Sequence, residues 1–260
     1  MENKAVILEI VESTAIITFN RPERYNAVNH DLIEGINYVF SVIKNDDNIR
    51  AVVLTGNGKG FCAGADLTTM GTLSAEDSRD YIIDNYKPIL NNFLNLRKPI
   101  IGAINGTAAG VGAAFALACD FRVMSKESAL LYAFIKIGLG PDGGASWLLS
   151  RQVGYSKALE IATEGKRVMG EECFKLGLTN KLVESDEILS VAKNWAIDLS
   201  KKPTIGIGIT KQDMIFSLNN DLLDTIEYEA KEQVAAFHSE DLKEGVSAFL
   251  EKRKANFKGK

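Results

Sequence analysis

Cysteine, proline and histidine are scarce in this chain, and these scarcities narrow the classes of protein it can belong to. Its 260 residues include three cysteines, five prolines and two histidines. Cys62, Cys119 and Cys173 are odd in number and form no C-x-x-C pair, so neither a disulfide framework nor a zinc site is indicated. Thirty Lys and Arg against 34 Asp and Glu give a net charge of -4, which provides no general attraction for nucleic acid or an anionic membrane. We therefore expect a cytoplasmic globular protein with no metal, nucleic-acid or membrane partner.

Long hydrophobic runs are also scarce, and one uncharged stretch needs separate consideration. Residues 99–119 contain no charge, and Gly102, Gly106 and Gly110 repeat at the spacing of packed membrane helices. Their neighbours are mostly Gly and Ala, with Asn105 among them, so the energy of insertion into a bilayer is poor. The stretch favours a buried strand, a glycine turn and a buried helix. The N-terminal residues lack the pattern of a signal peptide, so we expect no export.

The order of strand and helix patterns predicts an α/β core with a helical appendage. Two β-branched segments, residues 4–11 and 14–20, predict a hairpin, and the alternation after it predicts parallel strands. We divide the chain into a core, residues 1–200, and a C-terminal helical region, residues 201–260. The other expected elements are helices at 29–44, 77–96, 107–119 and 145–152, strands at 50–55, 99–104, 121–124 and 129–134, loops at 56–66 and 138–144, and almost only helices after Tyr155.

Three familiar catalytic or nucleotide-binding motifs are incomplete. Gly110-Val111-Gly112 has Phe115 where a dinucleotide fingerprint needs its third glycine. Residues 144–148 end in Leu where a serine hydrolase elbow ends in glycine. Gly58-Lys59 is followed by Gly60 rather than by the Ser or Thr of a phosphate loop. Dinucleotide binding, serine hydrolysis and nucleotide hydrolysis are therefore not indicated.

Two glycine-rich segments, residues 61–66 and 104–112, follow predicted strands. Small residues let a ligand approach the backbone, and the free N–H groups of a helix N-terminus favour negative charge. The pair could form an oxyanion hole, but the same glycines also suit tight packing of a strand on a helix. Spacing alone leaves both interpretations open.

Several motifs in order resemble the crotonase, or enoyl-CoA hydratase/isomerase, superfamily. They are Asn20-Arg21-Pro22, Asn26-Ala27, Phe61-Cys62-Ala63-Gly64-Ala65-Asp66, Lys98 to Gly106, Cys119-Asp120 and Gly138 to Gly144. The resemblance implies a crotonase-like ββα spiral core with a C-terminal helical appendage involved in trimerisation, and a homotrimer or hexamer. It also implies a coenzyme A thioester as substrate, with no separate cofactor. The backbone N–H groups of Ala65 and Val111 would polarise the thioester carbonyl.

Departures from the hydratase pattern bear on the reaction. Ala114 and Phe134 stand where hydratases carry glutamates, so the usual means of adding water is missing. Asp142 matches the acidic residue of phenylacetate-type isomerases, and one carboxylate is sufficient to move a double bond from position 3 to position 2. Local sequence alone also suits a turn or a helix N-cap at Asp142. A dehalogenase needs a mid-chain histidine, and a dienoyl isomerase needs a second carboxylate; both are lacking. A hydratase that uses Asp142 alone, or a non-catalytic acyl-CoA-binding relative, remains as an alternative.

The resemblance also implies where the substrate binds. The coenzyme A contacts would be Arg24, Ala63, Ala65, Asp66 and Leu67. Arg24 could equally be a solvated loop charge. The acyl pocket would include Tyr81, Tyr86, Phe134, Leu139 and Trp147. We expect the last three to shield Asp142 from water and so to raise its pKa.

Overall fold

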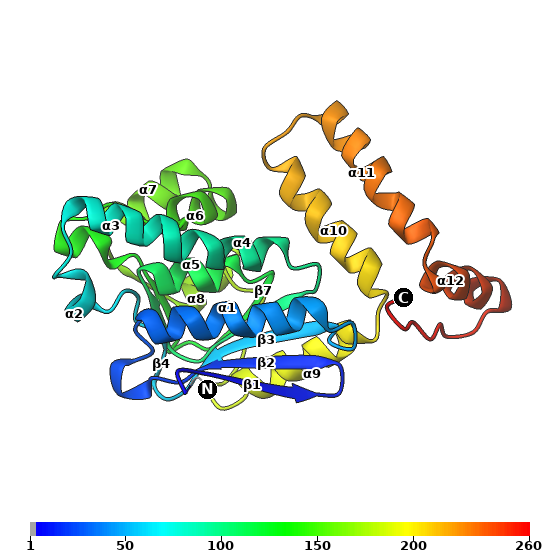
Figure 1. The fold of residues 1–260 in the computed structure, drawn as a ribbon, viewed down its shortest axis with the longest axis horizontal. Coiled ribbons are helices and arrows are strands. Elements are labelled where there is room, and N and C mark those ends of the chain that lie inside the picture. The colour runs from blue at the N-terminus through cyan, green and yellow to red at the C-terminus, as the bar shows by residue number, and fades with distance from the viewer. Residues whose placement is uncertain (1–3) are drawn as a thin grey trace.

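The computed structural model describes residues 4–260, which form two β-sheets enclosed by helices (Figure 1). The larger sheet has the strand order β1-β2-β3-β5-β7-β10. Its strands are β1 Val6–Val11, β2 Thr14–Phe19, β3 Ala51–Gly56, β5 Ile100–Ile104, β7 Phe121–Met124 and β10 Lys181–Leu182. The first two form the predicted antiparallel hairpin, and all later neighbours pair in parallel. The prediction of parallel strands after the hairpin is confirmed for this sheet.

A smaller sheet, of order β4-β6-β8-β9, lies beside the first. It contains β4 Gly60–Cys62, β6 Thr107–Ala109, β8 Ala129–Leu131 and β9 Arg167–Met169, the last of which is antiparallel to β8. From β3 to β8 the chain alternates between the sheets, giving one strand to each before a helical segment, which is the ββα spiral.

Short strands and an early strand end contradict four of the expected elements. The 56–66 loop contains β4, the predicted 107–119 helix begins with β6, the 129–134 strand ends at Leu131, and β9 and β10 interrupt the helices after Tyr155. Each missed strand has only two or three residues, too short for a period-two pattern to be recognised. Beyond β8 the chain forms a 3-10 turn, η3, over Ala133–Ile137.

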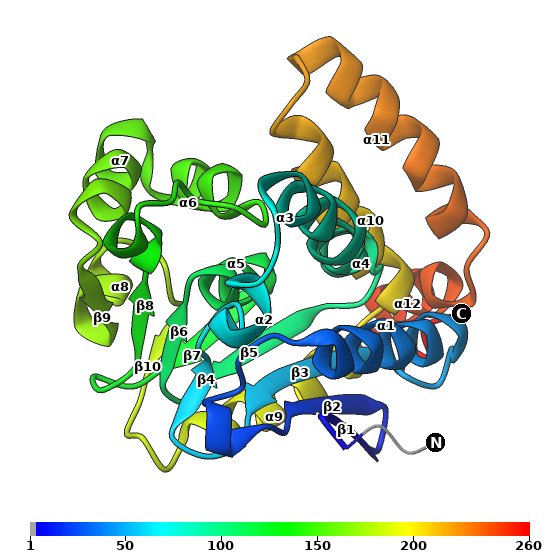
Figure 2. The same ribbon diagram turned by 60° about the vertical axis from the view of Figure 1, so that its left-hand side comes forward.

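Helices cover both faces of the large sheet, with α9 on one side and α1, α4 and α5 on the other (Figure 2). The helices are α1 His30–Asn45, α2 Leu67–Met70, α3 Ala75–Tyr81, α4 Lys87–Asn95, α5 Val111–Ala118, α6 Ala145–Val153, α7 Tyr155–Glu164, α8 Gly170–Lys175, α9 Ile188–Ser200, α10 Thr204–Ser217, α11 Leu222–Phe237 and α12 Glu240–Glu251. Helix α1 begins as predicted, because the Asn29 side chain accepts a hydrogen bond from the Leu32 N–H. Residues 99–119 form β5, β6 and α5. None of the helices within residues 4–260 is both long enough and apolar enough to cross a bilayer.

The helix predicted over 77–96 is divided into three parts. Helices α3 and α4 flank a π-helical turn, η2, over Ile82–Tyr86. Pro88 follows that turn, and a proline has no N–H to bond the carbonyl of the residue four positions earlier, here Asp84. A wider turn before the proline accommodates the lost hydrogen bond.

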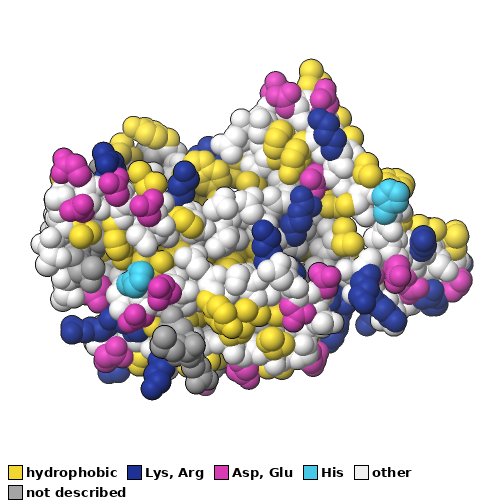
Figure 3. All heavy atoms as spheres, in the orientation of Figure 1, with side chains coloured by type: hydrophobic (Ala, Val, Ile, Leu, Met, Phe, Trp, Pro, Cys, Tyr) yellow, Lys and Arg dark blue, Asp and Glu magenta, His cyan; other side chains and the backbone are white. Residues whose placement is uncertain are grey.

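The C-terminal helices α10 to α12 extend away from the spiral core (Figure 1). Helix α10 is fixed to the core by Lys211, which lies 3.0 Å from the Asp120 carboxylate and also donates to the Phe93 carbonyl. Helices α11 and α12 expose large apolar side chains, and hydrophobic surface is visible over this region in Figure 3. The most exposed are Leu222, Leu223, Phe237, Phe249 and Leu250.

Candidate active site

The two glycine-rich segments meet at the ends of β4 and β6. A Cβ placed on Gly64 would lie 2.7 Å from the Ala109 carbonyl oxygen and 3.5 Å from the Gly110 Cα, so the two backbones are in direct contact. Both glycines have positive φ, 92° at Gly64 and 54° at Gly110. Only glycine accepts that conformation together with so close an approach. The glycines therefore serve packing and also bring Ala65 next to Val111.

The backbone N–H groups of Ala65 and Val111 face the space where those segments meet. Val28 donates to the Gly64 carbonyl and accepts from the Asp66 N–H, so it occupies one side of the extended chain. Consecutive peptide groups alternate sides, which turns the Ala65 N–H toward β6. Val111 is the first residue of α5, where N–H groups lack a helical acceptor.

Helix α5 is held at both ends. At its start, a Cβ on Gly112 would lie 2.4 Å from the Cys62 carbonyl oxygen, so the helix rests directly on β4. At its end, the buried Arg122 guanidinium donates to the carbonyls of Ala116, Leu117 and Cys119, and also to the Leu178 carbonyl and the Gln152 side chain. Five acceptors around one cation fix the helix axis, and with it the position of the Val111 N–H.

Asp142 lies on the turn between η3 and α6, half-buried. Gly143 next to it contacts α5, since a Cβ there would lie 2.8 Å from Val111 Cγ2. Burial raises the pKa of the Asp142 carboxyl to about 6. The N-cap of α6 is Gly144, without a side-chain hydrogen bond, so the interpretation of Asp142 as a helix cap is wrong.

The aromatic side chains expected around Asp142 are only partly placed as predicted. Phe134 is buried, and its ring lies 3.9 Å from the position of a Cβ on Gly110. Trp147, half-buried on α6, is covered by the Arg151 guanidinium at 4.1 Å. Leu139 is 51% exposed, so the expectation that it shields Asp142 is wrong.

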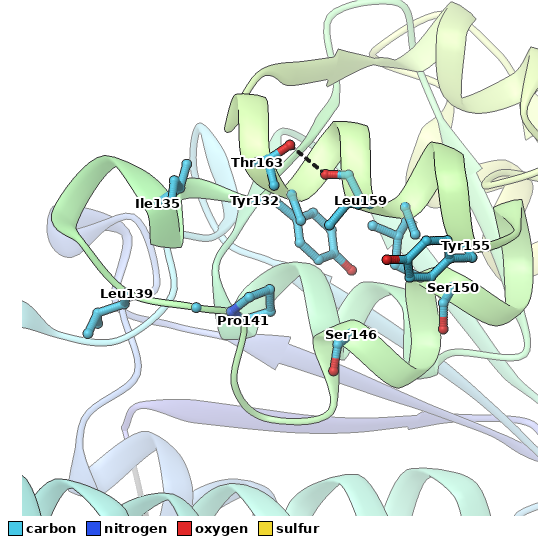
Figure 4. A pocket seen from close by; sticks show the side chains of 13 residues that line it. Tyr132, Ile135, Leu139, Pro141, Ser146, Ser150, Tyr155, Leu159 and Thr163 are labelled. Carbon is cyan, nitrogen blue, oxygen red and sulfur yellow. Dashed lines mark hydrogen bonds between the residues drawn. The ribbon is translucent and has the colours of Figure 1, made fainter.

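A mostly apolar hollow of about 400 Å³ lies on the α6 and α7 side of the Asp142 turn (Figure 4). Its lining includes Pro141, Tyr132, Leu159 and Tyr155, but not Asp142. Leu139 belongs to this lining and points away from the other labelled side chains. The hollow therefore adjoins the Asp142 turn through Pro141 without being lined by Asp142 itself.

Tyr86 connects the turn of Asp142 with the π-turn η2. Its ring carbon Cδ2 lies 3.6 Å from the position of a Cβ on Gly143, and the side chain is fully buried. Tyr81 stands at right angles to it, with ring centroids 5.6 Å apart. Both predicted pocket tyrosines therefore lie together beside the site.

Three of the five predicted coenzyme A contacts lie at the protein surface. Arg24, Ala63 and Leu67 are exposed, and the Ala63 N–H bonds the Tyr25 carbonyl beside Arg24. The Asp66 carboxylate instead accepts from Thr68 Oγ1 at 2.6 Å and Arg21 at 3.2 Å, and these bonds lower its pKa. The Asp66 carboxylate thus holds the loop, and its N–H is bonded to the Val28 carbonyl.

Sequence reasoning missed Arg122, Gly143 and the π-turn. Arg122 follows Cys119-Asp120 in the chain, but two of its five acceptors, the Leu178 carbonyl and the Gln152 side chain, come from distant residues brought together only by the fold. The contact of Gly143 with Val111 is also tertiary. For the π-turn, Pro88 was the available signal.

Fold and site together define a class of protein: a ββα spiral in which a half-buried carboxylate lies on a turn that packs against the start of α5. A family model described as enoyl-CoA hydratase/isomerase matches residues 9–260. The chain is 35% identical over 258 residues to the 1,2-epoxyphenylacetyl-CoA isomerase of Escherichia coli, covering 98% of each. It is 33% identical to the short-chain-enoyl-CoA hydratase of Clostridium acetobutylicum, covering 98% of this chain and 97% of that one.

Solved structures agree with this class. The enoyl-CoA hydratase of Bacillus anthracis superposes with a TM-score of 0.93 at 28% identity, over 98% of this chain and all of that one (100%). The chain belongs to the enoyl-CoA hydratase/isomerase family and has the crotonase fold.

Proposed function

We propose that this protein is an enoyl-CoA isomerase that moves a double bond from position 3 to position 2 of an acyl-CoA thioester. The observation that carries the proposal is Asp142, a half-buried carboxylate of raised pKa on a turn that touches Val111 through Gly143. A carboxylate whose pKa is about 6 is ionised at neutral pH, and it is a stronger base than an ordinary aspartate.

In the proposed reaction, Asp142 takes a proton from the carbon next to the thioester carbonyl. The electron pair moves into the carbonyl, and the resulting negative charge on its oxygen is stabilised by the Ala65 and Val111 N–H groups. Asp142 then returns the proton two carbons further along the chain, and the electrons shift back. The double bond ends between carbons 2 and 3, and the carboxylate is regenerated.

Two side chains favour isomerisation over hydration. Ala114 is buried within α5, and Phe134 is buried beside Gly110. Neither can activate or protonate water, so Asp142 would have to do both jobs in a hydratase. Hydration by Asp142 alone is the second candidate function, favoured by relatives that carry hydratase names. Acyl-CoA binding without turnover is the third.

The proposed acyl group is short or carries a ring. The rings of Tyr81, Tyr86 and Phe134 next to the site support an aromatic environment. The relative named for a phenylacetyl-CoA derivative supports a place in phenylacetate-type catabolism. Coenzyme A itself would extend along Ala63, Ala65 and Leu67, with Arg24 as phosphate partner.

We also propose a homotrimer or hexamer in the cytoplasm. The exposed apolar side chains of α11 and α12, among them Phe237, Phe249 and Leu250, support an interface between subunits in the 201–260 region. Sedimentation of the wild type and of Phe249→Glu tests this: the wild type should sediment as a trimer or a multiple of it, and the variant as smaller species. A monomeric wild type would contradict the assembly.

Incubation with two substrates tests the activity. We expect the purified protein to convert a 3-enoyl-CoA to the 2-enoyl-CoA, and not to hydrate the 2-enoyl-CoA. Chromatography of the thioesters measures both reactions. Hydration without isomerisation would support the second candidate, and binding without turnover the third.

A further inference from the structure

Tyr86 carries a buried hydroxyl that the protein leaves without a partner. The side chain is 0% exposed, and its oxygen is one of three buried side-chain polar atoms within the described residues that make no hydrogen bond. Tyr132, which is 1% exposed, shows the usual arrangement, since its hydroxyl donates to the Ala145 carbonyl at 3.1 Å. An unpaired buried hydroxyl has lost its hydration without gaining a hydrogen bond, so its presence calls for an explanation.

The position of Tyr86 explains which partner is missing. It lies at the end of the π-turn η2, and such turns are frequent at functional sites. The ring lies next to Gly143, and the charge of Asp142 contributes to raising the pKa of Tyr86. Burial is the larger cause of that rise, so the hydroxyl stays protonated and is a permanent donor.

Neither acceptor of the proposed reaction uses this donor. Burial is the cause of the raised pKa of Asp142, and no hydrogen bond from Tyr86 acts on it. The thioester oxygen is already assigned to the Ala65 and Val111 N–H groups. An acceptor further along the acyl group remains, on the side where the half-buried Tyr81 stands edge-on to Tyr86.

We propose that the Tyr86 hydroxyl donates a hydrogen bond to an oxygen on the ring of the bound acyl group, and so selects oxygen-bearing ring acyl-CoA thioesters over hydrocarbon ones. The inference rests on the proposed function for the place of the acyl group beside Asp142. It adds a specificity-determining residue and a substrate class to that function.

Binding of non-reacting ligands tests the proposal. Calorimetry compares phenylacetyl-CoA with its 2-, 3- and 4-hydroxy derivatives, for the wild type and for Tyr86→Phe. We expect at least one hydroxylated ligand to bind the wild type about tenfold more tightly than phenylacetyl-CoA, and this ratio to fall to about one in Tyr86→Phe. Tyr132→Phe, which also removes a buried hydroxyl, should keep the wild-type ratio.

Two outcomes would overturn the proposal: a wild-type ratio of one for all three derivatives, or a preference that survives in Tyr86→Phe. The wild-type measurement decides even where the variant does not fold. The assay requires no turnover, so its failure can be told from that of the proposed function. Isomerase activity without a preference for hydroxylated ligands would contradict only the role of Tyr86. A preference for hydroxylated ligands without activity would contradict only the isomerase assignment.

Discussion

Gly143 packs directly against Val111, with no room for a side chain between them: a Cβ on Gly143 would lie 2.8 Å from Val111 Cγ2. This contact joins the turn that carries the proposed base to the helix that carries a proposed oxyanion donor. The separation of the two groups therefore depends on the packing of the Gly143 backbone against the Val111 side chain.

Replacing Gly143 with alanine should lower kcat/KM for a 3-enoyl-CoA by about 10²-fold, because the new methyl group displaces the Asp142 turn from α5. Gly144→Ala is the matched control, since Gly144 has a similar positive φ of 73° but nothing within 4 Å of its Cβ position. Both variants strain the backbone, but only Gly143→Ala places a methyl group against Val111. Steady-state kinetics of the two variants therefore separate the effect of this clash from the effect of strain. Equal losses would mean that the contact with Val111 is irrelevant to catalysis.

Asp142→Asn should reduce kcat by about 10²- to 10⁴-fold while the affinity for coenzyme A stays the same, because only the proton transfer is removed. Asp186→Asn, at an exposed position, serves as the control and should behave like the wild type. Isomerisation assays and calorimetry provide the two measurements. A fully active Asp142→Asn variant would remove Asp142 from the mechanism.

The pH dependence of kcat/KM should report the ionisation of Asp142. Asp142 must be ionised to accept a proton, so the rate should rise with pH to a plateau, with an apparent pKa near 6. A profile that is already flat above pH 4 would indicate an ordinary aspartate and contradict the buried base.

The ionised Asp142 carboxylate that the reaction requires should lower the stability of the folded protein. The folded-state pKa of Asp142 is raised from 3.8 to about 6, so its contribution to stability is fully present below pH 3.8 and is lost as the pH rises through 6. Asp142→Asn lacks this ionisation and should therefore be more stable than the wild type at pH 8, but not at pH 3.5. Urea unfolding at both pH values checks the difference, and a variant less stable than the wild type at pH 8 would argue against it.

Arg122→Met should lower the free energy of unfolding by about 3 kcal/mol or more, because it leaves the carbonyls at the end of α5 without a donor. Arg79→Met is the control: that side chain is exposed and paired only with Asp80 among the described ion pairs, so a change within about 0.5 kcal/mol is expected. Urea unfolding of both variants provides the comparison. A small effect at Arg122 would show that α5 is held by packing alone.

Much of the fold could be predicted from local patterns. The hairpin and α1 follow from β-branched runs and from a helical period that begins at Asn29, and the structure confirms both. The three-residue strands β4, β6 and β9 could not be predicted, because their pairing partners come from distant parts of the chain. Local information is sufficient where an element is long enough to bury a face by itself.

For the site, sequence alone suggested the main groups but not their surroundings. The glycines before Ala65 and Val111 indicated a close backbone approach, and Gly64 and Gly110 do touch. The exposure of Leu139 and the unpaired hydroxyl of Tyr86 depend on how the turns pack, which no local pattern encodes.

The ββα spiral draws the proposed site from four separate stretches of chain: residues 63–66, Tyr86, residues 110–111 and residues 142–143. Parallel strands bring these stretches together only after the intervening crossovers have formed, and such non-local contacts arise late in folding. Catalytic activity should therefore be among the last properties that the chain gains as it folds. As it leaves the ribosome, the chain should stay inactive until several successive ββα turns have folded. Recovered turnover during refolding is therefore a stringent reporter of the native state.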